Sequence, residues 1–169
     1  MIPRYRVITM NHRDPVAPIE DVVRLIDVAG VSTSAVYGRS DVVEAMHEYQ
    51  PVVVATDPGS ETLVGAAVAR VCGADAHLMA FAIHPEWRNL GIGSALLRAL
   101  DQEIIHKGAS RLVALVQPGQ VGELAFTNQG FTRVDGLHLY LRTASMIPQE
   151  LATVERYGGG FPARACGRR

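Results

Sequence analysis

Residues 81–97 read Phe-Ala-Ile-His-Pro-Glu-Trp-Arg-Asn-Leu-Gly-Ile-Gly-Ser-Ala-Leu-Leu, and this stretch decides the fold. An apolar run ends in a His-Pro pair, a short polar link follows, and an Arg-x-x-Gly-x-Gly pattern (Arg88, Gly91, Gly93) leads into a helical pattern. The glycines permit a tight turn and a close approach of the backbone to a ligand. A new helix also presents unpaired N–H groups and the positive end of its dipole. The stretch therefore predicts an anion cradle that suits a pyrophosphate.

Three phosphate-binding motifs compete for this stretch. A P-loop needs a lysine after its last glycine, but Ser94 follows Gly93, and a dinucleotide fingerprint would place a third glycine where Leu96 stands. The third motif is the Arg/Gln-x-x-Gly-x-Gly/Ala loop of the GNAT superfamily of N-acetyltransferases, which residues 81–97 resemble in composition and order. An ordinary glycine-rich turn between a strand and a helix is the alternative interpretation.

The resemblance implies acetyl-CoA as the cofactor. Backbone N–H groups of the loop would bind its pyrophosphate with help from Arg88. The pantetheine arm would pair with the preceding strand, where that strand diverges from residues 112–116. A backbone N–H near Ala82 or Ile83 would face the thioester oxygen. The cofactor-binding residues that the resemblance implies are Phe81, Ala82, Ile83, Arg88, Asn89, Leu90, Gly91, Ile92, Gly93 and Ser94.

An acceptor amine must lose a proton before it attacks, so a general base is useful. GNAT enzymes commonly carry a glutamate near the start of the strand before the loop, but this chain reads Asp-Ala-His-Leu-Met at 75–79. A free imidazole has a pKa of about 6.5, which suits a base at neutral pH, so His77 is the candidate base and Asp75 is the reserve candidate. Period-two alternation predicts that His77 shares a strand face with Met79, Phe81 and Ile83. A histidine that merely caps the sheet edge is the other interpretation.

The departing thiolate is protonated by a tyrosine in many members of the superfamily. Phe126 stands at the position of that tyrosine, in the sequence Ala-Phe-Thr-Asn-Gln-Gly-Phe at 125–131. Tyr140 or His138 is a candidate substitute, although the interpretation of each as a packed strand residue is the favoured one. A thiol with an ordinary pKa of about 8.5 also leaves as a thiolate without full protonation.

The periodicities predict one α+β domain with a mixed, largely antiparallel central sheet flanked by helices, in an order similar to the GNAT fold. Residues 77–117 are expected to form one βαβ unit, with two parallel strands and a right-handed crossover. The domain is expected at residues 1–144, with a tail or linker at 145–169. Strands are expected at 5–10, 51–56, 62–71, 78–83, 111–116, 132–134 and 137–142, and helices at 18–29, 40–47, 94–107 and 119–128.

Composition narrows the class of function. A net charge of −1 over 169 residues offers no global field for nucleic acid or an anionic membrane. No apolar run approaches the roughly 20 residues of a membrane helix, and no signal-peptide core or metal-ligand spacing is present. The two widely spaced cysteines, Cys72 and Cys166, do not make a disulfide framework, which fits a reducing, cytoplasmic compartment.

The sequence thus favours an acetyl-CoA-dependent N-acetyltransferase whose acceptor is a small-molecule or protein amine. Residues 31–39 are expected to shape the acceptor side, and a homodimer is an assembly common among relatives. The missing glutamate and tyrosine keep a second hypothesis open, in which the domain binds acyl-CoA as a sensor with weak or no catalysis. An α+β domain unrelated to acyl-CoA is the third.

Overall fold

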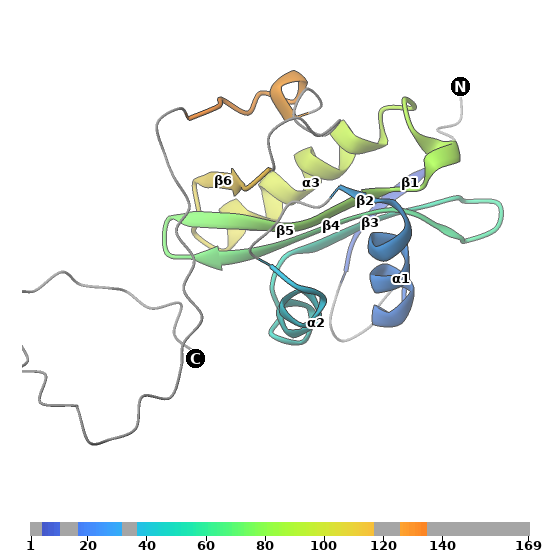
Figure 1. Ribbon diagram of the computed structural model, residues 1–169, viewed down its shortest axis with the longest axis horizontal. Coiled ribbons are helices and arrows are strands. Elements are labelled where there is room, and N and C mark those ends of the chain that lie inside the picture. The colour runs from blue at the N-terminus through green and yellow to red at the C-terminus, as the bar shows by residue number, and fades with distance from the viewer. Residues whose placement is uncertain (1–4, 11–16, 32–36, 117–125, 135–169) are drawn as a thin grey trace, which may run out of the picture.

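A six-stranded mixed sheet forms the centre of the protein, with α1 and α2 on one face and α3 on the other (Figure 1). The computed structural model describes residues 5–10, 17–31, 37–116 and 126–134. Its elements are β1 (Arg6–Thr9), α1 (Ile19–Ala29), β2 (Gly30–Val31), α2 (Arg39–His47), β3 (Val52–Thr56), β4 (Leu63–Cys72), β5 (Asp75–Ile83), the 3-10 turn η1 (Pro85–Trp87), α3 (Ile92–His106) and β6 (Arg111–Ala114).

The strand order confirms the predicted fold class. Strands β1, β3, β4 and β5 pair in that order, each antiparallel to the next. The predicted hairpin of β3 and β4 closes at Asp57, whose carboxylate accepts hydrogen bonds from the Gly59 N–H and the Ser60 hydroxyl. Strand β6 runs parallel to β5 after the α3 crossover, as expected. The result is an antiparallel sheet with one parallel βαβ unit at its edge.

A β-bulge on β5 corrects the predicted strand face. Val68 pairs with Ala80 but Ala69 pairs with Leu78, so Met79 is an extra residue on β5. Beyond the bulge the alternation reverses: Met79 packs with the α1 and α2 side, whereas Phe81 belongs to the α3 side. His77 therefore shares a face with Met79 but not with Phe81 or Ile83. A strict period of two fails here because a bulge re-aims every side chain that follows it.

Each face of the sheet has its own core. On the α3 face, Leu96 and Leu100 are completely buried and Ile92 is 1 % exposed. Gly65 of β4 lets this helix settle close to the sheet, because a Cβ there would lie 3.0 Å from both Ile92 Cγ2 and Leu96 Cδ1. On the other face, Val22, Leu25, Val42 and Met46 pack against the sheet. The start of α3 is thereby held at a definite height above the sheet.

Several predicted features differ from the structure. Strand β2 and turn η1 were not expected, and 132–134 is not a strand. Of the predicted helix at 119–128, the structure describes only the helical residues 126–128, while 137–142, Tyr140 and the tail at 145–169 lie outside the described residues. Cys72 is disulfide-bonded, which removes the cysteine argument for a reducing compartment.

Candidate functional site

The loop between β5 and α3 has the shape that the glycine pattern predicts. Gly91 is the N-cap of α3 and adopts the left-handed conformation, with φ of 81°. Asn89 is also left-handed, with φ of 61°. Residues 88–91 are all exposed, and the helix that they precede is 15 residues long. The first N–H groups of α3 are therefore directed at an open, glycine-lined approach, which is a binding position for an anion.

Gly93 presses the first turn of α3 against β5. A Cβ at Gly93 would lie 3.2 Å from Ile83 Cδ1 and 3.4 Å from Phe81 Cζ, tighter than most real contacts. Ile92, by contrast, directs its side chain into the core, where it is 1 % exposed. Among the ten predicted cofactor residues, Ile92 thus supports the loop through its buried side chain. Its backbone and that of the two glycines lie at the exposed start of α3. The residues present fit a pyrophosphate.

Arg88 is turned toward the protein's own carbonyl groups. Its Nε donates to the carbonyl oxygen of Ile83 at 3.3 Å, and its Nη2 donates to that of Ala29 at 3.4 Å. Ala29 is the last residue of α1, so Arg88 links the start of the loop to the end of that helix. Arg88 is nevertheless an exposed residue at the start of the loop.

One edge of β5 is shared by two strands. Strand β6 pairs with Asp75–Leu78 and then departs. Farther along the same edge, β2 pairs antiparallel, with Gly30 opposite Ala82 and Val31 opposite Phe81. The other edge of β5 is taken by β4 along its whole length. The predicted divergence after Leu78 is therefore present, and in this structure the vacated edge at Phe81 and Ala82 is paired with β2.

His77 lies on the α1 and α2 side of the sheet and meets Tyr37. The Tyr37 hydroxyl and His77 Nδ1 are 2.9 Å apart, and the two rings meet edge to face with centroids 6.3 Å apart. Partial burial raises the pKa of the Tyr37 hydroxyl; nearby Arg70 works against this increase and Asp41 adds to it. The partnership spans 40 residues of sequence, so no local pattern could have revealed it.

Asp75, the reserve candidate for the base, is held by a cation. Arg111 of β6 donates to its two carboxylate oxygens at 2.6 and 2.9 Å. Hydrogen bonding from Arg111 is the main reason that the pKa of Asp75 lies below its usual range, with a smaller contribution from the charge of His77. A carboxylate held in this way is a weak base, so the geometry favours His77 over Asp75.

Phe126 stands where the resemblance led us to expect a proton-donating tyrosine, and it is packed among aromatic rings. It is 6 % exposed, and its ring contacts Phe81 and Phe131 with centroids 6.0 and 5.1 Å apart. Its phenyl ring cannot donate a proton. The cluster instead packs Phe126 and Phe131 on the α3 side of β5.

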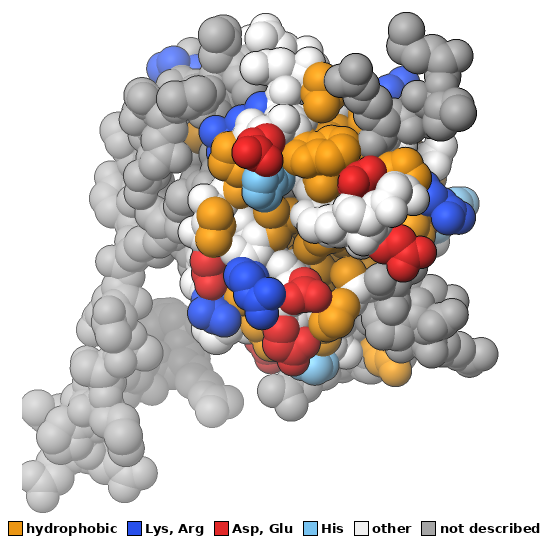
Figure 2. Space-filling model, turned by 90° about the vertical axis from the view of Figure 1, so that its right-hand side faces the viewer, with side chains coloured by type: hydrophobic (Ala, Val, Ile, Leu, Met, Phe, Trp, Pro, Cys, Tyr) orange, Lys and Arg blue, Asp and Glu red, His pale blue; other side chains and the backbone are white. Residues whose placement is uncertain are grey.

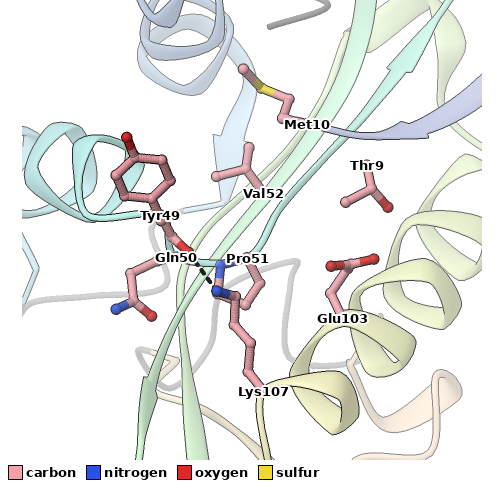
Figure 3. A pocket seen from close by; sticks show the side chains of 8 residues that line it. All are labelled: Thr9, Met10, Tyr49, Gln50, Pro51, Val52, Glu103 and Lys107. Atoms are coloured by element: carbon pink, nitrogen blue, oxygen red, sulfur yellow. Dashed lines mark hydrogen bonds between the residues drawn. The ribbon is translucent and has the colours of Figure 1, made fainter. Parts of the chain in front are cut away.

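A separate cavity of about 400 Å³ lies at the far end of α3. Figure 3 shows Lys107, the C-cap residue of α3, extending toward Tyr49, whose carbonyl oxygen accepts a 2.6 Å hydrogen bond from the lysine. Glu103 of α3 also lines this cavity. Fifteen residues of helix span about 22 Å, so this cavity is remote from Gly91 and is not the anion cradle. Within the described residues, no group of three His, Cys, Asp or Glu side chains is placed to hold a metal, and no helix is long and apolar enough to cross a membrane.

Comparisons with known proteins agree with the fold. The fold is similar to an aminoglycoside acetyltransferase from an uncultured soil metagenomic sample, solved with trehalose, at 17% identity and a TM-score of 0.62, covering 84% of this chain and 97% of that one. Aminoglycoside N-acetyltransferase AAC(6')-Iy, solved with CoA, matches at 16% identity and a TM-score of 0.62, covering 85% of this chain and 100% of that one. Glucosamine-6-phosphate N-acetyltransferase from Arabidopsis thaliana matches at 10% identity and a TM-score of 0.54, covering 83% and 97%.

No curated protein matches the sequence. The model of the "Acetyltransferase (GNAT) family", however, matches residues 24–131, more than half of the chain, and this span contains the glycine loop, His77 and Phe126. Acetyl-CoA is the acetyl donor typical of this family. The chain therefore belongs to the GNAT family of acetyltransferases.

Proposed function

We propose that this protein transfers an acetyl group from acetyl-CoA to a primary amine, which attacks the thioester directly in a ternary complex. The observation that carries the proposal is the exposed start of α3 at Gly91, whose left-handed backbone opens the helix N-terminus to a pyrophosphate. Bound acetyl-CoA supplies the activated thioester. The protein supplies positioning and proton transfer.

The loop and the edge of β5 would share the work of holding the cofactor. Backbone N–H groups from Asn89 to Ser94 bind the pyrophosphate, and Arg88 exchanges its contact with Ala29 for a phosphate oxygen. The backbone from Phe81 to Ile83 takes the pantetheine arm. Because β2 pairs with Phe81 and Ala82 in this structure, the arm and β2 compete for that edge, and β2 gives way when the arm binds.

His77 would act as the general base. An alkylammonium with a pKa of about 10.4 is well under one per cent neutral at pH 7, so a base increases the population that can attack. His77 lies just before the bulge at Met79 and close to where β6 leaves β5. It also faces the α1 and α2 side, where it meets Tyr37, one of the described residues of the expected acceptor segment 31–39. The thiol, with an ordinary pKa of about 8.5, departs as a thiolate; Tyr140 stays a predicted proton donor.

The acceptor is a small-molecule or protein amine. Figure 2 shows the end of the molecule that carries η1, where acidic, basic and hydrophobic side chains alternate on the described surface without a field of one sign. This mixed surface favours neither a polycation nor a polyanion. An amine screen should therefore cover amino sugars, aminoglycosides, lysine peptides and free peptide N-termini.

A second function has its own support. Phe126 removes the usual acid, and β2 occupies the edge that the pantetheine arm needs, so the alternative is a domain that binds acyl-CoA as a sensor with little or no catalysis. The two functions differ in turnover. We expect release of free CoA, measured with a thiol reagent, above the amine-free background for at least one amine class. Binding of acetyl-CoA without turnover for any amine would support the sensor instead.

A further inference from the structure

We propose that Tyr37 is a positioning residue for His77: its hydroxyl oxygen accepts a hydrogen bond from Nδ1–H and leaves the Nε2 lone pair ready to take the proton of the acceptor amine. The inference rests on the proposed function, in which His77 is the base. Its starting point is the 2.9 Å contact between the two side chains, which join the segment before α2 to β5.

The polarity of this hydrogen bond decides whether His77 can act as a base. If Tyr37 donated to Nδ1, the neutral ring would carry its proton on Nε2, and neither nitrogen would offer a free lone pair. If Tyr37 accepts from Nδ1–H, Nε2 is unprotonated. An imidazolium only donates, so this second polarity is the same before and after His77 takes a proton. Proton uptake then requires no rearrangement of the pair.

The surroundings of Tyr37 keep its hydroxyl oxygen able to accept the hydrogen bond from His77. Burial raises the pKa of its hydroxyl, so the group stays neutral at physiological pH and its oxygen remains an acceptor toward the imidazole. The edge-to-face contact of the two rings further limits the orientations that His77 can adopt. Tyr37 lies within the segment 31–39 and directly precedes α2, whose N-terminal turn is fixed by a 2.7 Å hydrogen bond from the Gly38 N–H to the Asp41 carboxylate.

The charges around the pair are partly balanced. Arg70 of β4 lies directly across from His77, and it pairs with Glu44 at 3.5 Å and Glu48 at 3.3 Å on α2. On the β6 side, Arg111 pairs with Asp75. Asp41 adds a negative charge near Tyr37. Among the described residues, the two arginines are each engaged by carboxylates, whereas Tyr37 hydrogen-bonds the imidazole directly and can orient it.

The pH dependence of turnover tests this polarity. In Tyr37→Phe the imidazolium loses its acceptor, so we expect the acidic limb of kcat/KM to move down by about half to one pH unit. We also expect kcat to fall about 10-fold, a fraction of the usual contribution of a general base. The KM for acetyl-CoA should stay within about twofold. Tyr49→Phe, at an exposed tyrosine outside the site, is the matched control and should leave the profile unchanged.

A shift of the acidic limb of kcat/KM to higher pH in Tyr37→Phe would show that Tyr37 donates to His77. An unchanged limb would show that Tyr37 has a purely structural role. Either result overturns the inference.

Nitrogen-15 NMR of His77 in the wild-type protein provides a readout that needs no turnover. We expect the neutral ring to be protonated on Nδ1, with loss of this preference in Tyr37→Phe. A ring protonated on Nε2 would overturn the inference. An Nδ1-protonated ring in a protein that turns over no amine would contradict the proposed function alone.

Discussion

Gly91 and Gly108 have nearly the same backbone conformation at opposite ends of α3, with φ of 81° and 86°. A valine at either site costs about 1–2 kcal/mol in backbone strain. Only at Gly91 would the side chain also stand in the path of a phosphate. We therefore expect Gly91→Val to abolish acetyl-CoA binding, whereas Gly108→Val, where a Cβ meets nothing within 4 Å, should bind normally. Isothermal titration calorimetry measures acetyl-CoA binding by both variants, and thermal melts check that both are folded. Normal binding by a folded Gly91→Val would show that the loop is misassigned.

Arg88 is predicted to bind phosphate although it contacts carbonyl groups in this structure. A hydrogen bond to a charged partner contributes about 1.5–3 kcal/mol, so Arg88→Ala should weaken acetyl-CoA binding at least about 10-fold. The loss should shrink as salt is raised, because part of it is electrostatic. Arg24→Ala removes an exposed arginine of α1 that pairs only locally with Asp21, and it is the charge-matched control. Equal affinity of the two variants would argue against a phosphate role for Arg88.

At the scale of elements, Gly65 sets the height of α3 above the sheet. A Cβ at this position would be 3.0 Å from two buried side chains and 3.3 Å from Ala55 Cβ. We expect Gly65→Ala to lower the free energy of unfolding by about 1–3 kcal/mol through overpacking, measured by urea denaturation. Gly59→Ala, in the β3–β4 turn, places its Cβ at an ordinary 3.6 Å from Asp57 and should change stability by less than about 0.5 kcal/mol. An equally stable Gly65→Ala would mean that α3 is not seated as described.

The pairing of Asp75 with Arg111 makes the junction of β5 and β6 sensitive to acid. Because Arg111 lowers the pKa of Asp75 in the folded state, the carboxylate binds fewer protons there than in the unfolded chain. The stabilisation is present above the unfolded pKa, about 3.9, and is lost as the pH falls through the lower folded value. Asp75→Asn should flatten the stability curve in this window, as measured by unfolding at stepped pH.

Asp101 should affect the pH dependence of stability in the opposite direction to Asp75. Burial raises its pKa, so ionisation of Asp101 opposes folding as the pH rises above the unfolded value. Asp101→Asn should therefore stabilise the protein at neutral pH relative to acid. If Asp75→Asn and Asp101→Asn changed the curve in the same direction, the described environments of the two carboxylates would be wrong.

At the scale of the whole molecule, elements with strong local signals could be predicted and those that depend on distant partners could not. The helix after Gly91 and the β3–β4 hairpin follow from periodicity and turn residues, and both are confirmed. Strand β2 has only two residues and exists because an edge of β5 is available, which no local pattern encodes. The bulge at Met79 is a property of two strands together, so alternation along β5 alone assigned the wrong face to Phe81 and Ile83.

The same distinction applies to the site. The glycine loop carries its signal within a few residues, and the structure places Gly91 and Asn89 in left-handed conformations that such a loop needs. The partnership of His77 with Tyr37 and the engagement of Asp75 by Arg111 both join residues far apart in sequence. Residue type and place in the strand therefore made His77 a candidate without revealing what orients it.

Binding of acetyl-CoA to the whole, folded protein is the central claim, and isothermal titration tests it most directly. Adenosine serves as the weak-binding control, since it lacks the pyrophosphate and the pantetheine arm. The account predicts saturable binding of one acetyl-CoA per chain with a Kd in the micromolar range, about −8 kcal/mol, and much weaker binding of adenosine. Absence of acetyl-CoA binding to a demonstrably folded protein would contradict both the acetyltransferase and the acyl-CoA sensor.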